Sequence, residues 1–347
     1  MKEKLVVIGN GMSGLRTIED LLELTKEKYD ITVYGEEPYV NYNRIMLSYI
    51  LSGEKSFEDT IINHTSWYEE NGITLNKGDK IISIDKVNKT IKSQSGKVES
   101  YDKLLIATGS LPFIPKTTGS DLKNVIAFRN KADVDTILET INKEKTAVVV
   151  GGGLLGLEAA YGIAMHGIKT ILVHRSGSIL SQQLDSTGGK LLQKNLEKYG
   201  IEFKLSTTIS EIFGSSEVER VEFNDGTSIE SNLVIFATGI IPNTALAKEA
   251  DLTVNKGIVV DDFLKTSDES IFAIGECVEH AGNTYGLVAP LYEQAKVLAK
   301  KLANKQTDGY AGSTLSTRLK ISGVDLFSAG DYLGDDTTEE LILLDEK

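Results

Sequence analysis

The chain has 347 residues, of which 41% are hydrophobic and 25% are charged, proportions typical of a globular protein large enough for two or three domains. Its net charge is −13 and its basic residues are interspersed with acidic ones, so we expect no nucleic-acid binding. No secretion signal and no apolar run long enough to cross a bilayer is visible, which predicts a cytoplasmic protein without membrane contact.

The first 35 residues read as a strand, a glycine-rich turn, a helix and a second strand. An apolar run at residues 4–8 precedes the glycine-rich turn 9–14, a helical pattern continues to about Leu24, and a second apolar run covers residues 31–34. A G-x-G-x-x-G turn between a strand and a helix is typical of dinucleotide binding, because its glycines allow a tight turn, close approach of a pyrophosphate, and close packing of helix on strand. The expected contacts are Gly9, Asn10, Gly11, Ser13 and Gly14.

An acidic residue about 20 positions beyond such a turn normally binds the adenosine ribose. Glu36 and Glu37 both follow the second strand, and we favour Glu36 for its position. The alternative is an acidic turn that is merely solvated.

The same unit occurs a second time. Residues 147–150 form an apolar run, 151–156 a second glycine turn, a helical pattern continues to about His166, and another apolar run covers 170–173. Two units predict two dinucleotides, and the alternative is two structural turns without ligands. After the last run stand His174 and Arg175, where an NADH-preferring domain carries an acid; arginine accommodates a 2′-phosphate, so the sequence favours NADPH over NADH.

Each unit is followed by a strand that ends in Ala-Thr-Gly, at residues 107–109 and 237–239. A third landmark, the strand-Gly-acid stretch 270–276, follows Pro242 and is expected to return to the first sheet. The fold class is therefore α/β, with two Rossmann-like domains, the second inserted in the first, and a partial C-terminal α+β domain. The predicted boundaries are 1–115 and 242–305 for the domain built on the first unit, 116–241 for the inserted domain built on the second unit, and 306–347 for the beginning of the C-terminal domain.

The order of these motifs resembles the pyridine nucleotide–disulfide oxidoreductase superfamily, within it the branch of ferredoxin, rubredoxin and nitrite reductases, and most narrowly the assimilatory NAD(P)H-dependent nitrite reductases. The likeness covers nearly the whole chain and rests on the stretches 8–12, 37–48, 151–160, 273–277 and 286–290. It implies that the first unit binds FAD, that the second binds NADPH or NADH, and that the strand-Gly-acid element holds the ribityl chain. Hydride then passes directly between the two cofactors, so no acid or base catalyst is required.

The resemblance also implies site residues. For FAD these are Arg44, Ile81, Ala107, Thr108, Gly109, Arg129, Gly275, Glu276 and Val288, in addition to the turn residues above. For NAD(P) they are Gly151, Gly152, Gly153, Leu154, Leu155, Gly156, Glu158, His174, Arg175, Thr238 and Gly239. Glu158 would lie near the nicotinamide, although by its sequence alone it fits a surface helix equally well. One departure concerns Tyr49, where many relatives carry a lysine, and it puts one flavin contact in doubt.

The single cysteine, Cys277, limits where electrons can go. It cannot form an internal disulfide, a Cys-x-x-Cys pair or an iron–sulfur site, and the histidines lack metal-ligand spacing, so no metal is expected. Residues 38–60 contain no cysteine, which disfavours the disulfide reductases and the NADH oxidases or peroxidases of the superfamily. We expect Cys277 to pack as a small buried residue.

The sequence after Val288 predicts a helix to Leu302, two strands between Thr314 and Ser328, and a third at 340–344. Relatives have a longer third domain here, so we expect the chain to be a fragment of a longer polypeptide that would continue into iron–sulfur and sirohaem segments. The interpretation is an electron-entry module of an assimilatory nitrite reductase, passing electrons to a redox domain or a small iron–sulfur protein. A free-standing rubredoxin or ferredoxin reductase and a nucleotide-binding sensor without turnover are the alternatives, and a homodimer stays open.

Overall fold

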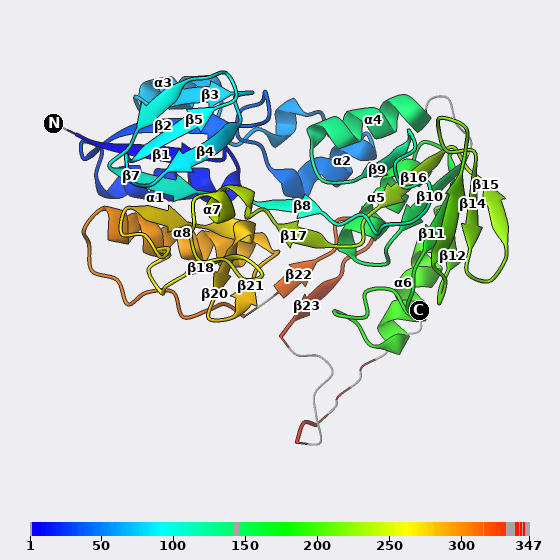
Figure 1. Cartoon of the computed structure of the whole chain (residues 1–347). Helices are drawn as coiled ribbons and strands as arrows, with labels where there is room; N and C mark the ends of the chain where they lie inside the picture. Colours follow the sequence, from blue (N-terminus) through cyan, green and yellow to red (C-terminus); the bar gives the residue numbers. More distant parts are fainter. Residues whose placement is uncertain are drawn as a thin grey trace.

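The computed structural model describes residues 2–141, 146–314, 316–330, 337–339, 341 and 343. Two five-stranded parallel sheets lie side by side, each with helices on its faces (Figure 1). The first sheet has the order β19-β7-β1-β2-β3. Its strands are β1 (Glu3–Ile8), β2 (Tyr29–Gly35), β3 (Thr74–Lys77), β7 (Lys103–Ile106) and β19 (Ile271–Ala273).

The second sheet repeats this order as β12-β11-β10-β16-β9. Its strands are β9 (Val125–Ala127), β10 (Thr146–Val150), β11 (Lys169–Val173), β12 (Ile201–Lys204) and β16 (Leu233–Phe236). Strand β19 belongs to the first sheet but comes later in the chain than every strand of the second sheet. The predicted insertion of one Rossmann-like unit in the other is therefore confirmed. The exact boundaries of the domains stay a prediction.

Helices cover both sheets, as parallel strands buried on both faces require. Helix α1 (Met12–Leu24) packs against α8 (Val288–Leu302), whose bounds agree with the sequence prediction. The second sheet carries α4 (Lys131–Ile141), α5 (Leu154–Ala164) and α6 (Ser186–Glu197). The short helix α2 (Leu47–Leu51) belongs to the first part of the chain but packs against α5, and Leu51 is fully buried in the second core.

Smaller elements connect and flank the two units. Strands β8 (Ser110–Pro112) and β17 (Ile240–Pro242), which follow the two Ala-Thr-Gly segments, pair with each other and join the units in the middle of Figure 1. Each unit also has a small antiparallel sheet. It consists of β4 (Ile81–Asp85), β5 (Thr90–Ser93) and β6 (Val98–Ser100) in the first unit and of β13 (Ile209–Phe213), β14 (Arg220–Phe223) and β15 (Ser228–Glu230) in the second. The remaining short elements are α3 (Thr65–Glu70), α7 (Ala245–Glu249), β18 (Ile258–Val260), β20 (Val278–His280), β21 (Asn283–Thr284) and the 3₁₀ turns η1 (Arg44–Met46), η2 (Glu58–Thr60) and η3 (Gly275–Cys277).

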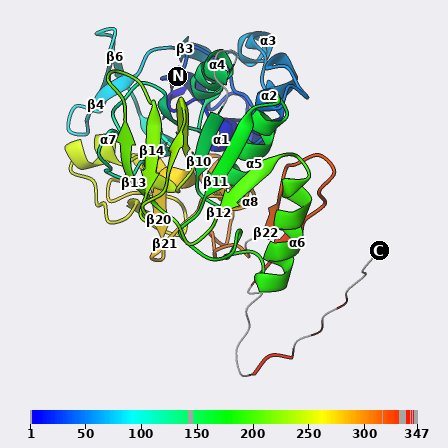
Figure 2. The ribbon, with the colours of Figure 1, turned by 90° about the vertical axis from the view of Figure 1, so that its right-hand side faces the viewer.

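The C-terminal segment contains the two predicted strands, β22 (Ser316–Arg318) and β23 (Phe327–Ala329), which pair antiparallel. Leu319 and Ile321, just after β22, are buried in the core of the second sheet. In the view of Figure 2, β10, β11 and β12 of the second sheet lie side by side. The third strand expected at 340–344 falls largely outside the described residues, and no strand is assigned at Leu341 or Leu343.

Glycines at two equivalent positions permit the close packing of helix on strand that the motif predicts. A Cβ atom added to Gly14 would lie 3.0 Å from the Cβ of Ala107, and one added to Gly156 would lie 1.9 Å from the carbonyl oxygen of Gly151. At Gly156 a small shift could not relieve this clash, because the Gly151 carbonyl belongs to the backbone of the turn itself.

We therefore expect Gly156→Ala to lower the free energy of unfolding by about 1–3 kcal/mol, the range for an overpacked buried position. Gly153→Ala is the matched control, because a Cβ there meets no atom within 4 Å. Thermal unfolding of both variants without added nucleotide measures the difference. Equal stability of the two would contradict the packing argument.

Candidate functional site

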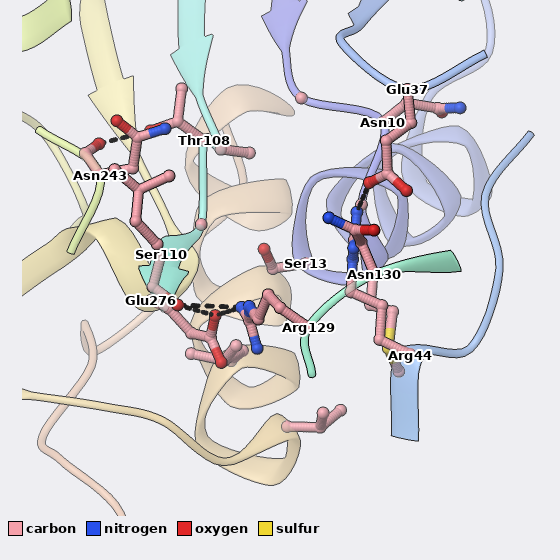
Figure 3. Close-up of a pocket in the computed structure, with 18 of the residues that line it drawn as sticks. Asn10, Ser13, Glu37, Arg44, Thr108, Ser110, Arg129, Asn130, Asn243 and Glu276 are labelled. Carbon is pink, nitrogen blue, oxygen red and sulfur yellow. Dashed lines mark hydrogen bonds and ion pairs between the residues drawn. The ribbon is translucent and has the colours of Figure 1, made fainter. Parts of the chain in front are cut away.

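A cavity of about 890 Å³ lies where the two units meet, within the range for a cofactor site. Its walls come from the first glycine turn, from the ends of β2, β4 and β7, from the crossover at residues 129–130, from the beginning of α5, and from β22. Elements far apart in the sequence thus surround one space, and Figure 3 shows the side chains from one side of it.

The first glycine turn is built by a close approach of two strand ends. Gly9 has φ +116°, and a Cβ there would lie 2.1 Å from the carbonyl oxygen of Ala107, so only glycine fits. Gly11, the N-cap of α1, has no atom within 4 Å of its Cβ position and no side chain capping the helix. The first N–H groups of α1 therefore face open space at the cavity, which is a favourable place for a phosphate.

The two acidic residues after β2 lie in different surroundings, although both line the cavity. Glu36 is largely exposed and pairs with Lys80 at 2.8 Å. Glu37 is partly buried and forms an ion pair with Arg44, while the Tyr42 hydroxyl donates to its Oε2 at 2.7 Å. Glu36 stays the predicted ribose ligand, because Glu37 already balances a buried guanidinium.

A second, partly buried ion pair also lines the cavity. Arg129 forms an ion pair with Glu276. The Arg129 guanidinium donates a hydrogen bond to the Ser110 hydroxyl at 2.9 Å, and this hydroxyl donates to the Glu276 carboxylate at 2.8 Å. The two charged groups point toward each other in Figure 3. Their side chains are only 18% and 14% exposed, so the pair places two opposite charges side by side in a largely desolvated part of the cavity.

A polar network supports the turn from behind. The Tyr68 hydroxyl donates to Asn10 Oδ1 at 2.8 Å, and Asn10 Nδ2 donates to the Tyr39 carbonyl at 3.2 Å. Trp67 and Tyr68 also pack on each other, with ring centroids 5.2 Å apart. No motif in the sequence indicates the hydrogen bond between Tyr68 and the turn.

Glu158 is buried, with 4% of its surface exposed, so the alternative that it is a surface helix residue is wrong. It lines the cavity from α5, and its Oε1 accepts a hydrogen bond from the main-chain N–H of Lys320 at 3.0 Å. Burial raises the pKa of its carboxyl to about 7, against the opposing effects of the Lys320 charge and N–H and of the Ser48 hydroxyl.

The second glycine turn has the same construction. Gly151 has φ +124°, and a Cβ there would lie 2.3 Å from the carbonyl oxygen of Ala237, while the position of Gly153 is open and α5 has no side-chain cap. The imidazole of His174 packs against Gly152, whose N–H donates to Nδ1 at 3.0 Å. Burial and the neighbouring Arg175 charge lower the pKa of His174, so the ring acts as a neutral acceptor.

The cavity brings together most of the predicted FAD contacts but few of the NAD(P) contacts. Its lining includes Gly9, Asn10, Gly11, Ser13, Glu36, Arg44, Ile81, Ala107, Thr108, Gly109, Arg129, Glu276 and Val288, and from the other set Leu154, Leu155 and Glu158. Gly14 and Gly275 permit close packing instead, since a Cβ atom added to Gly275 would lie 2.5 Å from Ser13 Oγ. The other eight NAD(P) positions, which are Gly151, Gly152, Gly153, Gly156, His174, Arg175, Thr238 and Gly239, do not line the cavity.

Several lining residues were absent from the sequence prediction. Ser110, Asn130 and Asn243 follow strand ends, where small or polar residues are a weak signal, and the Asn243 carbonyl accepts from Thr108 Oγ1 at 2.8 Å. The stretch 316–320 carried no motif, and only the tertiary fold brings it to the cavity.

Cys277 is fully buried in the core of the first unit, as expected, and its Sγ lies 3.2 Å from the carbonyl oxygen of Ile274. Burial raises the pKa of the thiol, which keeps it protonated. Among the described residues no group of three or more histidine, cysteine, aspartate or glutamate side chains is arranged to hold a metal ion. In the same part of the chain no helix combines the length and apolarity needed to span a membrane.

The sequence model of the pyridine nucleotide-disulphide oxidoreductases matches residues 3–297. The chain belongs to this family. Curated relatives of the oxidoreductase include a nitrite reductase [NAD(P)H] of Bacillus subtilis, 47% identical over 100% of this chain and 43% of its own length. An NADH oxidase of Methanocaldococcus jannaschii is 33% identical over 88% of this chain and 71% of its own length.

Solved structures place the oxidoreductase in the same fold. NADH:rubredoxin oxidoreductase of Clostridium acetobutylicum has a TM-score of 0.81 at 28% identity, covering 100% of this chain and 86% of that one. A water-forming NADH oxidase of Lactobacillus brevis, bound to NADH, has a TM-score of 0.86 at 23% identity, covering 95% and 75%. The family and these neighbours indicate the use of FAD and NAD(P)H. The chain spans less than half the length of the first two curated relatives, 43% and 45%.

The raised pKa of Glu158 predicts a pH effect on the stability of the oxidoreductase. The folded protein keeps this proton up to about pH 7, whereas the unfolded chain releases it near pH 4.5. As the pH rises from 4.5 to 7, this difference lowers the free energy of unfolding by roughly 3 kcal/mol. Glu158→Gln lacks this dependence. We therefore expect the free energy of unfolding of the variant, relative to that of the parent, to be roughly 2–4 kcal/mol higher at pH 8 than at pH 5. Urea unfolding at both pH values tests this, and a stability difference independent of pH would contradict it.

Proposed function

We propose that the chain oxidises NAD(P)H at a bound FAD and delivers the electrons to the downstream iron–sulfur and sirohaem centres of an assimilatory nitrite reductase. The observation that carries the proposal is the shared cavity: the first glycine turn and the start of α5 after the second turn border the same space. Two dinucleotides bound at these turns would extend toward each other. The 47% identity to a nitrite reductase [NAD(P)H] over the full chain supports the destination of the electrons.

The residues present fit FAD. The open position at Gly11 and the uncapped N-terminus of α1 suit a pyrophosphate, and Glu36 suits the adenosine ribose. Arg44 and Arg129 suit the phosphate charge, while Thr108, Gly109 and Glu276 suit the ribityl chain. When bound, FAD supplies the ability to accept a hydride and to release electrons one at a time. The task of the protein is to hold and orient, and to exclude water from the cavity.

The second turn suits the coenzyme in the same way, through Gly153 and the uncapped N-terminus of α5. Gly151, Gly152 and Gly156 shape that turn, and Thr238 and Gly239 border it from the neighbouring strand end. Arg175 adds a positive charge after β11, and the adjacent His174 is tied to the turn rather than available as an acid. This arrangement supports NADPH as the favoured coenzyme.

A free-standing rubredoxin or ferredoxin reductase is the second candidate. It is favoured by the full coverage against the clostridial NADH:rubredoxin oxidoreductase, of which this chain spans 86%. Clustered cysteines encoded beyond Lys347 would support the nitrite reductase, and rapid reduction of added rubredoxin by the chain would support the free-standing enzyme. A nucleotide-binding sensor would show neither useful turnover nor dye reduction.

Anaerobic mixing of the yellow, FAD-containing protein with NADPH or NADH tests the central claim. We expect both nucleotides to bleach the flavin absorbance, NADPH faster or at lower concentration, and the reduced protein to pass electrons to an artificial dye. A protein that cannot be loaded with FAD, or a flavin that neither nucleotide reduces, would contradict the proposal and favour the nucleotide-binding sensor.

The coenzyme preference has its own test in Arg175→Ala. Loss of one charge-assisted contact to a 2′-phosphate is expected to lower kcat/KM for NADPH about tenfold and to leave that for NADH within about twofold. Arg220→Ala is the matched control, because Arg220 is a half-exposed arginine of the same unit on β14, away from the turn. Equal losses for both coenzymes would show that Arg175 does not read the phosphate.

A further inference from the structure

Glu158 lacks the partner that a buried carboxylate normally has. Among the described residues no lysine, arginine or histidine side chain lies within ion-pair distance of it. A buried charge without compensation is costly. The effects that oppose this cost are, in descending order, the charge of the Lys320 ammonium, the main-chain N–H of Lys320 and the Ser48 hydroxyl. Among them, the N–H makes a hydrogen bond to Glu158 at 3.0 Å, although Lys320 lies 162 positions later in the chain.

The main chain at Lys320 is held in place from both sides. Leu319 and Ile321 are buried in the second core, at 6% and 4% exposure. The Leu319 N–H donates to the Leu326 carbonyl at 3.3 Å, and the Tyr199 hydroxyl donates to the Ser322 carbonyl at 3.1 Å. The N–H that reaches Glu158 is therefore anchored by the fold and independent of the Lys320 side chain, whose Nζ donates to the Arg318 carbonyl at 3.1 Å.

The same stretch closes the cavity near α5. Ser316, Thr317, Arg318 and Lys320 line it together with Glu158, Leu154 and Leu155. β22 and its continuation thus lie where the nicotinamide end of a coenzyme bound at the second turn would enter. The C-terminal segment belongs to neither Rossmann-like unit, yet it reaches the place where the two units face each other.

We propose that residues 316–320 form a wall of the coenzyme pocket, and that the main-chain N–H of Lys320 is a positioning group that orients the Glu158 carboxyl toward the nicotinamide. With one oxygen held by Lys320, the carboxyl presents its other oxygen to the carboxamide N–H of the coenzyme, which is a matching donor. This inference rests on the proposed NAD(P)H oxidation.

The test compares two substitutions at one position in the FAD-loaded protein. Lys320→Pro removes the N–H, whereas Lys320→Ala keeps it and removes only the side chain. Because both variants lack the lysine side chain, their comparison isolates the N–H. We expect the limiting rate of flavin reduction to be about tenfold lower in the proline variant than in the alanine variant, the effect of one lost hydrogen bond to a charged group. Equal rates in the two variants would overturn the proposal.

Two readouts separate positioning from general damage. In a Glu158→Ala background, Lys320→Pro should change the rate by less than twofold, because the group it acts through is gone. In the parent, the rate should depend on pH around neutrality, and Lys320→Pro should move that dependence to higher pH because the N–H favours the ionised carboxyl. The other groups that face Glu158 are the Lys320 ammonium, the Ser48 hydroxyl and Tyr49, whose own pKa is raised by burial and by the Glu158 charge.

A second pair of variants covers the case in which the proline variant does not fold. Glu158→Gln keeps an oxygen for the Lys320 N–H, and Glu158→Leu does not. Glutamine should retain the rate within about threefold and leucine should lose about tenfold, and equal losses would overturn the proposal. If the parent protein itself is not reduced by either nucleotide, the proposed function fails, an outcome distinct from parent reduction with no difference between these variants.

Discussion

The close approach of each glycine turn to the strand that ends in Ala-Thr-Gly is the constraint on which the rest of the structure depends. Both turns place a glycine with positive φ against a carbonyl oxygen of that neighbouring strand, Ala107 in one unit and Ala237 in the other, at distances no side chain could tolerate. The approach directs α1 and α5 so that their uncapped N-termini point out of the sheet edge. An anion is the natural partner for each of these helix ends.

The second level of organisation brings the two edges to one cavity. The β8–β17 pair ties the segments after the two Ala-Thr-Gly motifs together, and α2 crosses from the first unit to pack on α5. Gly162 makes this possible, since a Cβ there would lie 2.8 Å from Leu51. The cavity therefore has walls from both units, which a hydride transfer between two bound dinucleotides requires.

Charge inside the cavity is balanced in two different ways. Arg129 with Glu276 and Arg44 with Glu37 form ion pairs next to the expected phosphates and ribityl hydroxyls. Glu158 has no ion pair among the described residues; the Lys320 charge, the Lys320 N–H and the Ser48 hydroxyl oppose the effect of its burial only in part, and its pKa rises to about 7. A carboxyl that can hold or release its proton near neutrality thus lies at the α5 side of the cavity, where the coenzyme is proposed to bind.

The sequence by itself determined the two βαβ units, the insertion of one in the other and α8, and it named most of the residues of the expected FAD set that line the cavity. Glycine turns after apolar strands leave local signals that few other structures produce. It also determined that Cys277 would be buried and that electrons must leave without a cysteine pair. Only the tertiary structure decided that Glu158 is buried, that Tyr68 supports the turn at Asn10, and that Lys320 lies at the cavity. These contacts join residues 58 to 162 positions apart, and long-range packing of this kind leaves no periodicity or motif in the chain.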